Sequence, residues 1–283
     1  KRSKKGIKMI KKLIRGLIVS GTICLLGVMP AIATQYSYID IAKSKIGSIE
    51  IKKFNEAPEL KVEVAAGELP SVEKRLPEEP LVLKPVEEIG QYGGKWRWPR
   101  IKPNELGAFL DYYAMERLVR YSPDFKKVFP NVAKDFKWSE DGKTVTFYLR
   151  KGMKWSDGVP FTADDFMFWY EDIILNDELT PAKPDLLKVA EELGKMEKID
   201  DYTFKISFAK PYGAFTEKLA GWWVPFLRAP KHYLKQFHPK YTPIEEIEKQ
   251  MKKEGFDTWV NLFYHHYGAL RNDPKLPVIT AWQ

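Results

Sequence analysis

The chain has 283 residues, of which 44% are hydrophobic and 14% aromatic, enough to build one large domain or two small ones. Its net charge is +8, but residues 1–33 hold eight basic and no acidic side chains, which leaves 38 charges of each sign in the remainder. This neutral remainder excludes the basic footprint of a nucleic-acid-binding domain. The only cysteine is Cys24, so residues 34–283 can form no disulfide and hold no cysteine nucleophile.

The first 33 residues have the three parts of an export signal. Eight basic side chains lie in residues 1–15, an apolar run covers residues 17–28, and Ala31-Ile32-Ala33 is a small-x-small cleavage site. The apolar run is about 12 residues long, shorter than the ~20 residues of a membrane-spanning helix. We therefore expect a signal peptide that is cleaved after Ala33, with an uncleaved membrane anchor as the alternative.

Cys24 does not fit a lipidation site. A lipoprotein box has a leucine three residues before the cysteine and a small residue directly before it, but these positions hold Gly21 and Ile23. The cysteine also lies in the middle of the apolar run. We interpret it as an apolar filler.

Residues 34–90 are predicted to form an extension outside the core. They are rich in Lys, Glu and Pro. One short helix is expected over residues 57–66, ended by Gly67. The rest should be extended, because residues that precede proline avoid the helical region.

From Gln91 onward the pattern is that of a globular domain. Residues 94–98 are predicted to form its first strand. Residues 109–119 have helical spacing, with Tyr112, Met115 and Val119 on one face.

Two hairpins follow in this part of the chain. Residues 135–139 are predicted to pair with residues 143–150, and residues 195–199 with residues 202–208. In the second strand of each hairpin, apolar and polar residues alternate, which is typical of a half-buried strand. The residues that share one face are Val145, Phe147 and Leu149 in the first of these strands, and Tyr202, Phe204, Ile206 and Phe208 in the second.

A helix is predicted to begin at Thr162. Thr162 is a suitable N-cap, and Asp165 lies three residues later, where its carboxylate can reach back to form a capping box. The apolar residues that follow recur with helical spacing and should form a buried stripe. They are Phe166, Trp169, Tyr170, Ile173 and Ile174.

A later helix is predicted to open at Thr242-Pro243, with proline at the first helical position, and to end before Gly255. The stretch 225–241 is expected to be irregular. Strands, hairpins and helices mixed in this way favour an α/β or α+β domain.

No catalytic constellation is evident. The four histidines include no His-x-x-x-His spacing, so no metal site is expected. Asp164-Asp165 and Glu171-Asp172 could be the paired acids of a glycosidase, which need a separation of about 5–10 Å across the sugar. Helix capping explains Asp164 and Asp165 without catalysis. The glycine-rich residues 90–94 precede a strand, whereas a phosphate-binding loop precedes a helix.

The pair Trp222-Trp223 is a candidate binding element. Two adjacent rings, flanked by Gly221 and Pro225, cannot easily both be buried on one face. One of them could stack on the plane of a sugar or peptide. Packing in the core is the alternative.

Several stretches carry a resemblance to a known family. They are LVRYSPD (118–124), PNVAK (130–134), WSEDGK (138–143), LRKGMKWSDGVPFTADD (149–165) and APKHYL (229–234). They resemble the family 5 extracellular solute-binding proteins of bacterial ABC importers, which bind peptides, nickel or oligosaccharides. The resemblance covers roughly residues 92–283 and the signal peptide, and residues 55–90 are similar to an N-terminal extension of one subgroup.

The resemblance implies an α/β fold of the type II periplasmic-binding-protein class, in which two lobes close on a ligand. Members are usually much longer than this chain. We therefore expect an N-terminal fragment with mainly the first lobe present, divided into a signal peptide (1–33), an extension (34–90) and an incomplete first lobe (91–283).

The resemblance also implies a function. We expect a monomeric, exported substrate-binding component, in the periplasm or on the outer face of the cytoplasmic membrane, that captures oligosaccharides or oligopeptides for an ABC permease. Asn104 and Phe109 are expected to face the cleft, with Trp222 and Trp223 as its aromatic wall. No catalytic residue, metal or cofactor is expected. A secreted glycan-active hydrolase and a structural cell-envelope protein remain as alternatives.

Overall fold

The computed structural model describes residues 38–40, 54–83, 88–93, 116–122, 124–221, 227, 229–268 and 273–279. The chain divides into two compact units, Lys1–Gln35 and Tyr36–Gln283, and every described residue lies in the second. The predicted export signal and the predicted strand 94–98 lie outside the described residues. Within the described part, no helix is both long and apolar enough to cross a membrane.

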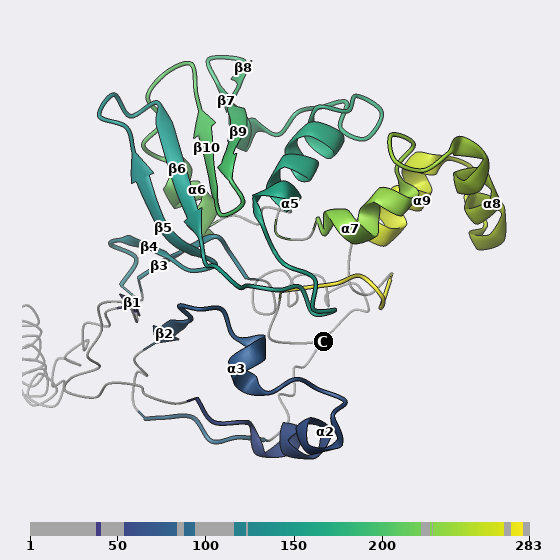
Figure 1. Cartoon of the computed structure of the whole chain (residues 1–283). Coiled ribbons are helices and arrows are strands. Elements are labelled where there is room, and N and C mark those ends of the chain that lie inside the picture. The colour runs from purple at the N-terminus through teal and green to yellow at the C-terminus, as the bar shows by residue number, and fades with distance from the viewer. Residues whose placement is uncertain are drawn as a thin grey trace, which may run out of the picture. The chain divides into compact units, whose positions relative to one another are not determined.

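The centre of the described structure is a four-stranded antiparallel sheet with the order β5-β6-β10-β9 (Figure 1). Both predicted hairpins are confirmed, and they join through the pairing of β6 with β10. The strands are β5 (Ala133–Trp138), β6 (Thr144–Leu149), β9 (Lys195–Asp200) and β10 (Thr203–Ser207).

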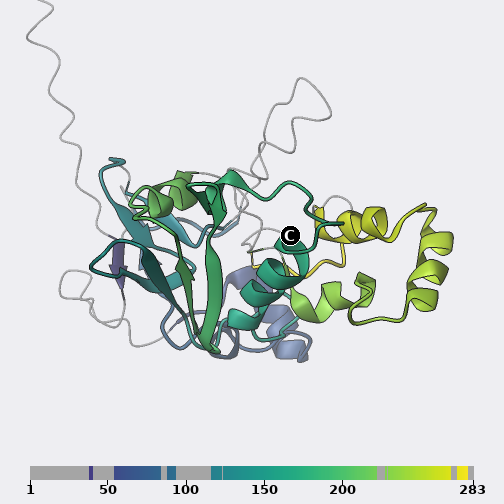
Figure 2. The same cartoon turned by 90° about the horizontal axis from the view of Figure 1, so that it is seen from above.

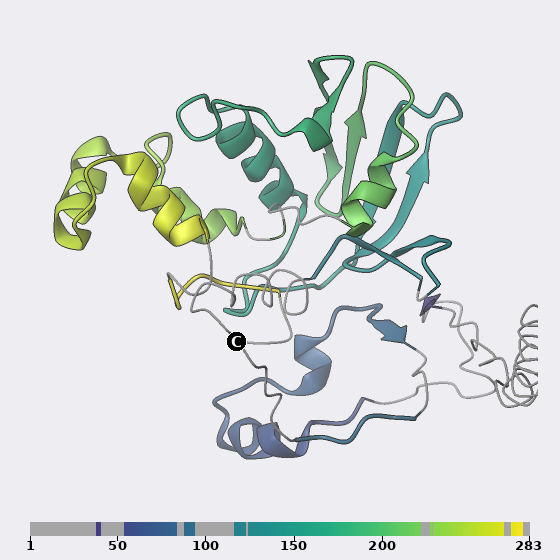
Figure 3. The same cartoon turned by 180° about the vertical axis from the view of Figure 1, so that it is seen from behind.

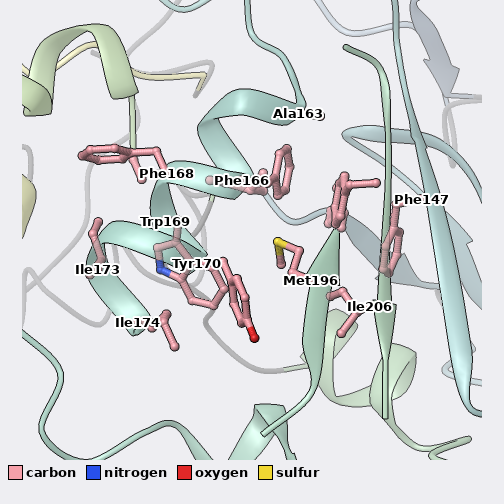
Figure 4. Packing of buried hydrophobic residues seen from close by; sticks show 14 of the residues in the cluster. Phe147, Ala163, Phe166, Phe168, Trp169, Tyr170, Ile173, Ile174, Met196 and Ile206 are labelled. Atoms are coloured by element: carbon pink, nitrogen blue, oxygen red, sulfur yellow. The ribbon is translucent and has the colours of Figure 1, made fainter. Parts of the chain in front are cut away.

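A column of aromatic rings runs across one face of this sheet. Phe147 pairs in register with Phe136 on β5 and with Phe204 on β10. The rings of Phe147 and Phe204 stack at 5.3 Å, and Phe166 stacks on Phe204 at 4.3 Å. Figure 4 shows this face covered by the helix that carries Phe166.

The helix on the sheet begins with the predicted capping box. Helix α5 spans Ala163–Phe168; the side chain of Thr162 accepts from the amide of Asp164 at 3.3 Å, and Asp165 Oδ2 accepts from the amide of Thr162 at 3.0 Å. The helix continues as a π-helix, η5 (Trp169–Ile174). The predicted apolar stripe is buried, as expected, although a π-helical turn was not predicted.

The C-terminal helices lie on the side of α5 that faces away from the sheet (Figure 2). They are α7 (Lys231–Leu234), η8 (Lys235–Phe237), α8 (Ile244–Glu254) and α9 (Trp259–Gly268). Helix α8 ends at Gly255, as predicted, where φ is +79°. Pro243 is its N-cap, so the predicted place of this proline at the first helical position is wrong by one residue.

Two other expectations about local structure are wrong. The stretch expected to be irregular contains α7 and η8, each too short to give a periodic pattern, yet Leu234 and Phe237 are buried. The predicted helix over residues 109–119 does not extend to its C-terminal end, because Val119 begins strand β3 (Val119–Tyr121), which pairs with β4 (Val128–Pro130). Residues 109–115 lie outside the described part.

The short elements around the sheet complete the fold. Helix α6 (Phe215–Gly221) lies beside β3 (Figure 3). The 3-10 turn η6 (Asp185–Leu187) leads into the small hairpin of β7 (Lys188–Val189) and β8 (Glu192–Leu193).

The extension contains more regular structure than the sequence predicts. The predicted helix is confirmed as η2 (Pro58–Leu60) and α2 (Lys61–Ala66), ended by Gly67. A further helix, α3 (Val72–Arg75), replaces the extended backbone that was expected, because Glu56 accepts from the amide of Val72 at 3.0 Å and pairs with the guanidinium of Arg75. Strand β2 (Leu81–Leu83) pairs with β1 (Tyr38–Asp40).

The extension is attached to the ends of β5 and β6 (Figures 1 and 3). The amide of Glu78 donates to the carbonyl of Lys151 at 2.9 Å, and Lys134 forms an ion pair with Glu79. Lys154 Nζ donates to the carbonyl of Lys74 at 2.8 Å. These bonds hold residues 74–79 against the body of the protein.

Candidate functional site

The four residues predicted to bind ligand lie outside the described part of the structure. Asn104 and Phe109 fall in residues 94–115, and Trp222 and Trp223 in residues 222–226. Their roles stay predictions.

A hollow of about 690 Å³ lies between the extension and the body of the protein, and we call it the larger hollow. Its apolar wall comes from both sides. These apolar residues are Leu76, Pro77, Pro80, Leu81, Leu83, Val132, Met153, Val278 and Ile279. An apolar wall with a few convergent polar groups is the common form of a small-molecule site.

The polar groups of the larger hollow are positioned by the β3–β4 hairpin. A tight turn begins at Ser122, whose amide donates to the carbonyl of Lys127 at 2.8 Å. The amide of Asn131 then donates to the carbonyl of Leu118 at 3.1 Å. This pairing brings Asn131, directly after β4, beside the residues that precede β3.

Glu116 is the centre of this polar group. Its Oε2 accepts from Asn131 Nδ2 at 2.7 Å and from Arg120 Nη2 at 2.9 Å. Asn131 Nδ2 also donates to the carbonyl of Arg117 at 2.7 Å. Among the described residues, the buried Nε of Arg120 has no hydrogen-bond partner. The group therefore offers a fixed carboxylate and a guanidinium with remaining donor capacity.

Arg150 holds the two walls of the larger hollow together. Its buried guanidinium donates through Nη1 to the carbonyl of Glu79 at 2.8 Å and through Nε to the carbonyl of Asn131 at 3.2 Å. One side chain thus connects the extension to the loop that carries the polar group. Arg150 lies within one of the family stretches, but no sequence pattern indicates its partners, which are backbone carbonyls.

The acidic residues considered as a glycosidase pair have structural partners. Asp165 accepts from the amides of Thr162 and Lys231, each at 3.0 Å, and from Trp155 Nε1 at 3.2 Å. Burial raises the pKa of Asp165, and these hydrogen bonds oppose the increase. Asp164 pairs with Lys198 at 3.0 Å. Helix capping accounts for the Asp164-Asp165 pair, as interpreted from the sequence.

Asp172, one of the two remaining candidate acids, is also engaged. It is buried in the π-helix η5 and accepts from Lys240 Nζ and from the hydroxyl of Tyr241, each at 2.5 Å. Burial and this hydrogen bond raise the pKa of Tyr241 to about 12.

The two buried histidines also have partners within the fold. His238 Nε2 lies 3.1 Å from the carbonyl of Asp172, and its Nδ1 accepts from the amide of Lys240 at 3.1 Å. His266 lies between Asp273, at 2.6 Å, and Glu254, at 3.0 Å. Within the described ranges, no group of three or more His, Cys, Asp or Glu side chains is arranged to hold a metal ion.

Residues 127–263 match the family described as "Bacterial extracellular solute-binding proteins, family 5 Middle". This segment of the chain belongs to that family. The resemblance seen in the signature stretches is confirmed.

Three relatives extend the match beyond this segment. The periplasmic alpha-galactoside-binding protein of Rhizobium meliloti (strain 1021) is 35% identical over 198 residues, which are 63% of this chain and 28% of that protein. A solved structure of an oligopeptide-binding protein OppA is 43% identical, with a TM-score of 0.77 over 84% of this chain and 36% of that one. The periplasmic binding protein MelB of Agrobacterium fabrum C58, solved with stachyose, is 27% identical, with a TM-score of 0.59 over 90% and 39%.

These relatives confirm the predicted fold class, the two-lobe periplasmic-binding-protein fold. The chain spans between 28% and 39% of the length of the three relatives. All three are named as binding proteins, and none is named as an enzyme.

Proposed function

We propose that the protein that contains this chain is the substrate-binding component of an ABC importer. It captures an oligosaccharide or an oligopeptide outside the cytoplasm and delivers it to a membrane permease. The observation that carries this proposal is the structural match over 84% and 90% of the chain, to one protein named for oligopeptides and one solved with stachyose. The predicted N-terminal export signal supports this location.

The larger hollow supplies a candidate surface for the captured solute. It combines an apolar wall with the carboxylate of Glu116 and the guanidinium of Arg120. In sequence, Glu116 and Arg120 come soon after the segment that holds Asn104 and Phe109. A sugar hydroxyl or a peptide carbonyl could accept from Arg120, and a sugar hydroxyl or a peptide amine could donate to Glu116.

Ligand-induced thermal shift on the full-length gene product tests the proposal. Oligosaccharides such as stachyose are compared with peptides of two to five residues. A ligand present at a hundred times its Kd raises the free energy of unfolding by about 2.7 kcal/mol, which is several degrees in Tm. Stabilisation by one class identifies the solute, and stabilisation by neither contradicts solute capture.

Two further measurements separate the alternatives. Turnover of a chromogenic glycoside would establish the hydrolase, which the structural engagement of Asp165 and Asp172 disfavours. Stimulation of the partner permease's ATPase activity in liposomes by the loaded protein, and not by the empty one, is expected of an importer component. A structural envelope protein would give neither signal.

A further inference from the structure

A second, smaller hollow lies on the outer face of the sheet, where Glu78 and Glu79 of the extension meet β5 and β6. It encloses about 430 Å³, and none of its lining residues is shared with the larger hollow. This volume is within the range of about 300–1,000 Å³ that is usual for small-ligand sites. The smaller hollow is therefore a separate feature of the protein.

Strand alternation directs a row of side chains into this hollow. Val145, Phe147 and Leu149 point into the core, so Tyr148 between them points outward. Tyr148 is in register with Asp135 on β5 and with Thr203 on β10, so the row crosses three strands.

A second aromatic ring lies beside this row. Tyr202 directly precedes β10; its carbonyl accepts from the amide of Leu149 at 2.7 Å, and its amide donates to Asp200 Oδ1 at 2.8 Å. These bonds are made by the backbone of Tyr202, so they hold the residue at the edge of the hollow and leave its side chain available for a ligand. Two tyrosine rings on ordered backbone thus line one small surface site.

Several polar groups of the hollow have no hydrogen-bond partner among the residues that the structure describes. They are the hydroxyls of Tyr148 and Tyr202, the carboxylate of Glu78 and the ammonium of Lys151. Glu79, in contrast, is paired with Lys134, and Lys137 lies over the ring of Tyr148 at 5.6 Å. The hollow therefore offers both acceptors and donors.

The charges of the hollow are mixed and nearly cancel. Its lining has four carboxylates and three ammonium groups, from Glu78, Glu79, Asp135, Asp200, Lys134, Lys137 and Lys151. This balance disfavours a phosphate and a metal cation, which need charge of a single sign. It suits a neutral ligand with many hydroxyls, because each hydroxyl can donate to a carboxylate and accept from an ammonium or a phenol.

We propose that this hollow binds one saccharide unit, at a site separate from the captured solute. The apolar face of the sugar ring packs against Tyr148 and Tyr202, and its hydroxyls bond to Glu78, Asp135 and Lys151. The hollow is open and polar, so the affinity is in the millimolar range. Such a site holds the protein near envelope or environmental glycans.

¹⁹F NMR of the chain labelled with 3-fluorotyrosine tests this directly. The variants Tyr148→Phe and Tyr202→Phe assign the two resonances, and galactose and glucose are titrated to about 100 mM. Both resonances are expected to move together and to saturate, while the resonance of Tyr264, on α9, stays fixed. Glycerol and glycylglycine are the controls for a polyol without a ring and for a zwitterion.

Variants link the signal to the hollow. In Tyr148→Phe the saturable shift of Tyr202 is expected to weaken severalfold, because the ring remains and one hydroxyl is lost. Glu78→Gln on the extension should weaken the shifts of both tyrosines. Lys205→Thr, which lies on the same strand as Thr203 but outside the hollow, should change neither.

Three outcomes would overturn the proposal. Neither sugar shifts the two resonances; glycylglycine shifts them as strongly as the sugars do; or Glu78→Gln leaves the titration unchanged. Solute capture is read separately by the thermal shift of the full-length protein, so either proposal can fail without the other.

Discussion

At the scale of single residues, buried polar side chains join parts of the chain that are distant in sequence. Asp165 caps its own helix but also accepts from the amide of Lys231, 66 residues later. Asp172 binds Lys240 and Tyr241 from a different element. The sequence predicted the cap, because its partners are three residues apart. It could not predict the distant partners, which depend on how α5 and the C-terminal helices pack.

His238 should make stability depend on pH. Burial lowers the pKa of His238 below its ordinary 6.5, against the opposing hydrogen bond to the carbonyl of Asp172. As the pH falls below 6.5, the unfolded chain binds a proton that the folded protein does not, so stability decreases. The slope reaches at most about 1.4 kcal/mol per pH unit.

The test is urea unfolding of the wild type and of His238→Gln at pH 7, 6 and 5. The variant keeps a donor and an acceptor but cannot titrate, so its slope over this range should be smaller. His265→Gln, on α9, is the control: its free energy of unfolding should depend on pH as strongly as that of the wild type. Equal slopes in the wild type and His238→Gln would contradict the assignment.

At the scale of secondary-structure elements, the hairpins were predictable and the helical turns were less so. Apolar and polar residues alternate over the six residues of β6, which is a strong local signal. The burial of their side chains alternates in the same way. The residues predicted to be buried in η5 are buried, but the turn is a π-helix. The amide of Leu175 donates to the carbonyl of Tyr170, five residues earlier. Nothing in the apolar spacing distinguishes that turn from an α-helix. Single-turn helices such as α7 are too short to give a period.

Gly194 should be required by the packing behind the β7–β8 hairpin. A Cβ at this position would lie 2.6 Å from Cε1 of Phe208, whose ring is buried. Gly194→Ala is therefore expected to lower the free energy of unfolding by about 1–3 kcal/mol, measured by urea unfolding. Gly213→Ala is the matched control, since a Cβ there meets nothing within 4 Å. Equal effects of the two substitutions would refute the steric explanation.

The β7–β8 turn should be open to stabilisation. Ala190 and Glu191 both have positive φ, at 54° and 64°, in a two-residue connection that favours Asn-Gly. The double substitution Ala190→Asn, Glu191→Gly is expected to raise the free energy of unfolding by roughly 0.5–1 kcal/mol. Thermal unfolding followed by circular dichroism measures the change, and an unchanged or lower Tm would contradict it.

At the scale of the whole molecule, the family stretches predicted the fold class, and the composition of the extension predicted a segment with little core. Pro80 is its only fully buried residue among residues 54–83. How the extension attaches was not predictable, because three of the bonds described above end on backbone carbonyls, which every residue carries. The bonds from Arg150 and Lys154 end on carbonyls of Glu79 and Lys74.

Arg150 should control the attachment of the extension. Arg150→Met removes donors to the carbonyls of Glu79 and Asn131 and leaves buried acceptors without partners, at an expected cost of about 2 kcal/mol or more. Trypsin should then cleave faster after Lys74 and Arg75. Lys151→Met changes only an exposed side chain and should leave the cleavage rate unchanged. A wild-type cleavage rate in Arg150→Met would show that the other bonds suffice.

The phenylalanine column across the sheet has a consequence for cooperativity. Phe136 and Phe147 come from one hairpin and Phe204 from the other, while Phe166 comes from the helix between them. Neither hairpin can bury its ring without the other, and an isolated two-stranded hairpin is marginal in water. The two hairpins and α5 should therefore exchange their amide protons as a single unit, with one common opening free energy.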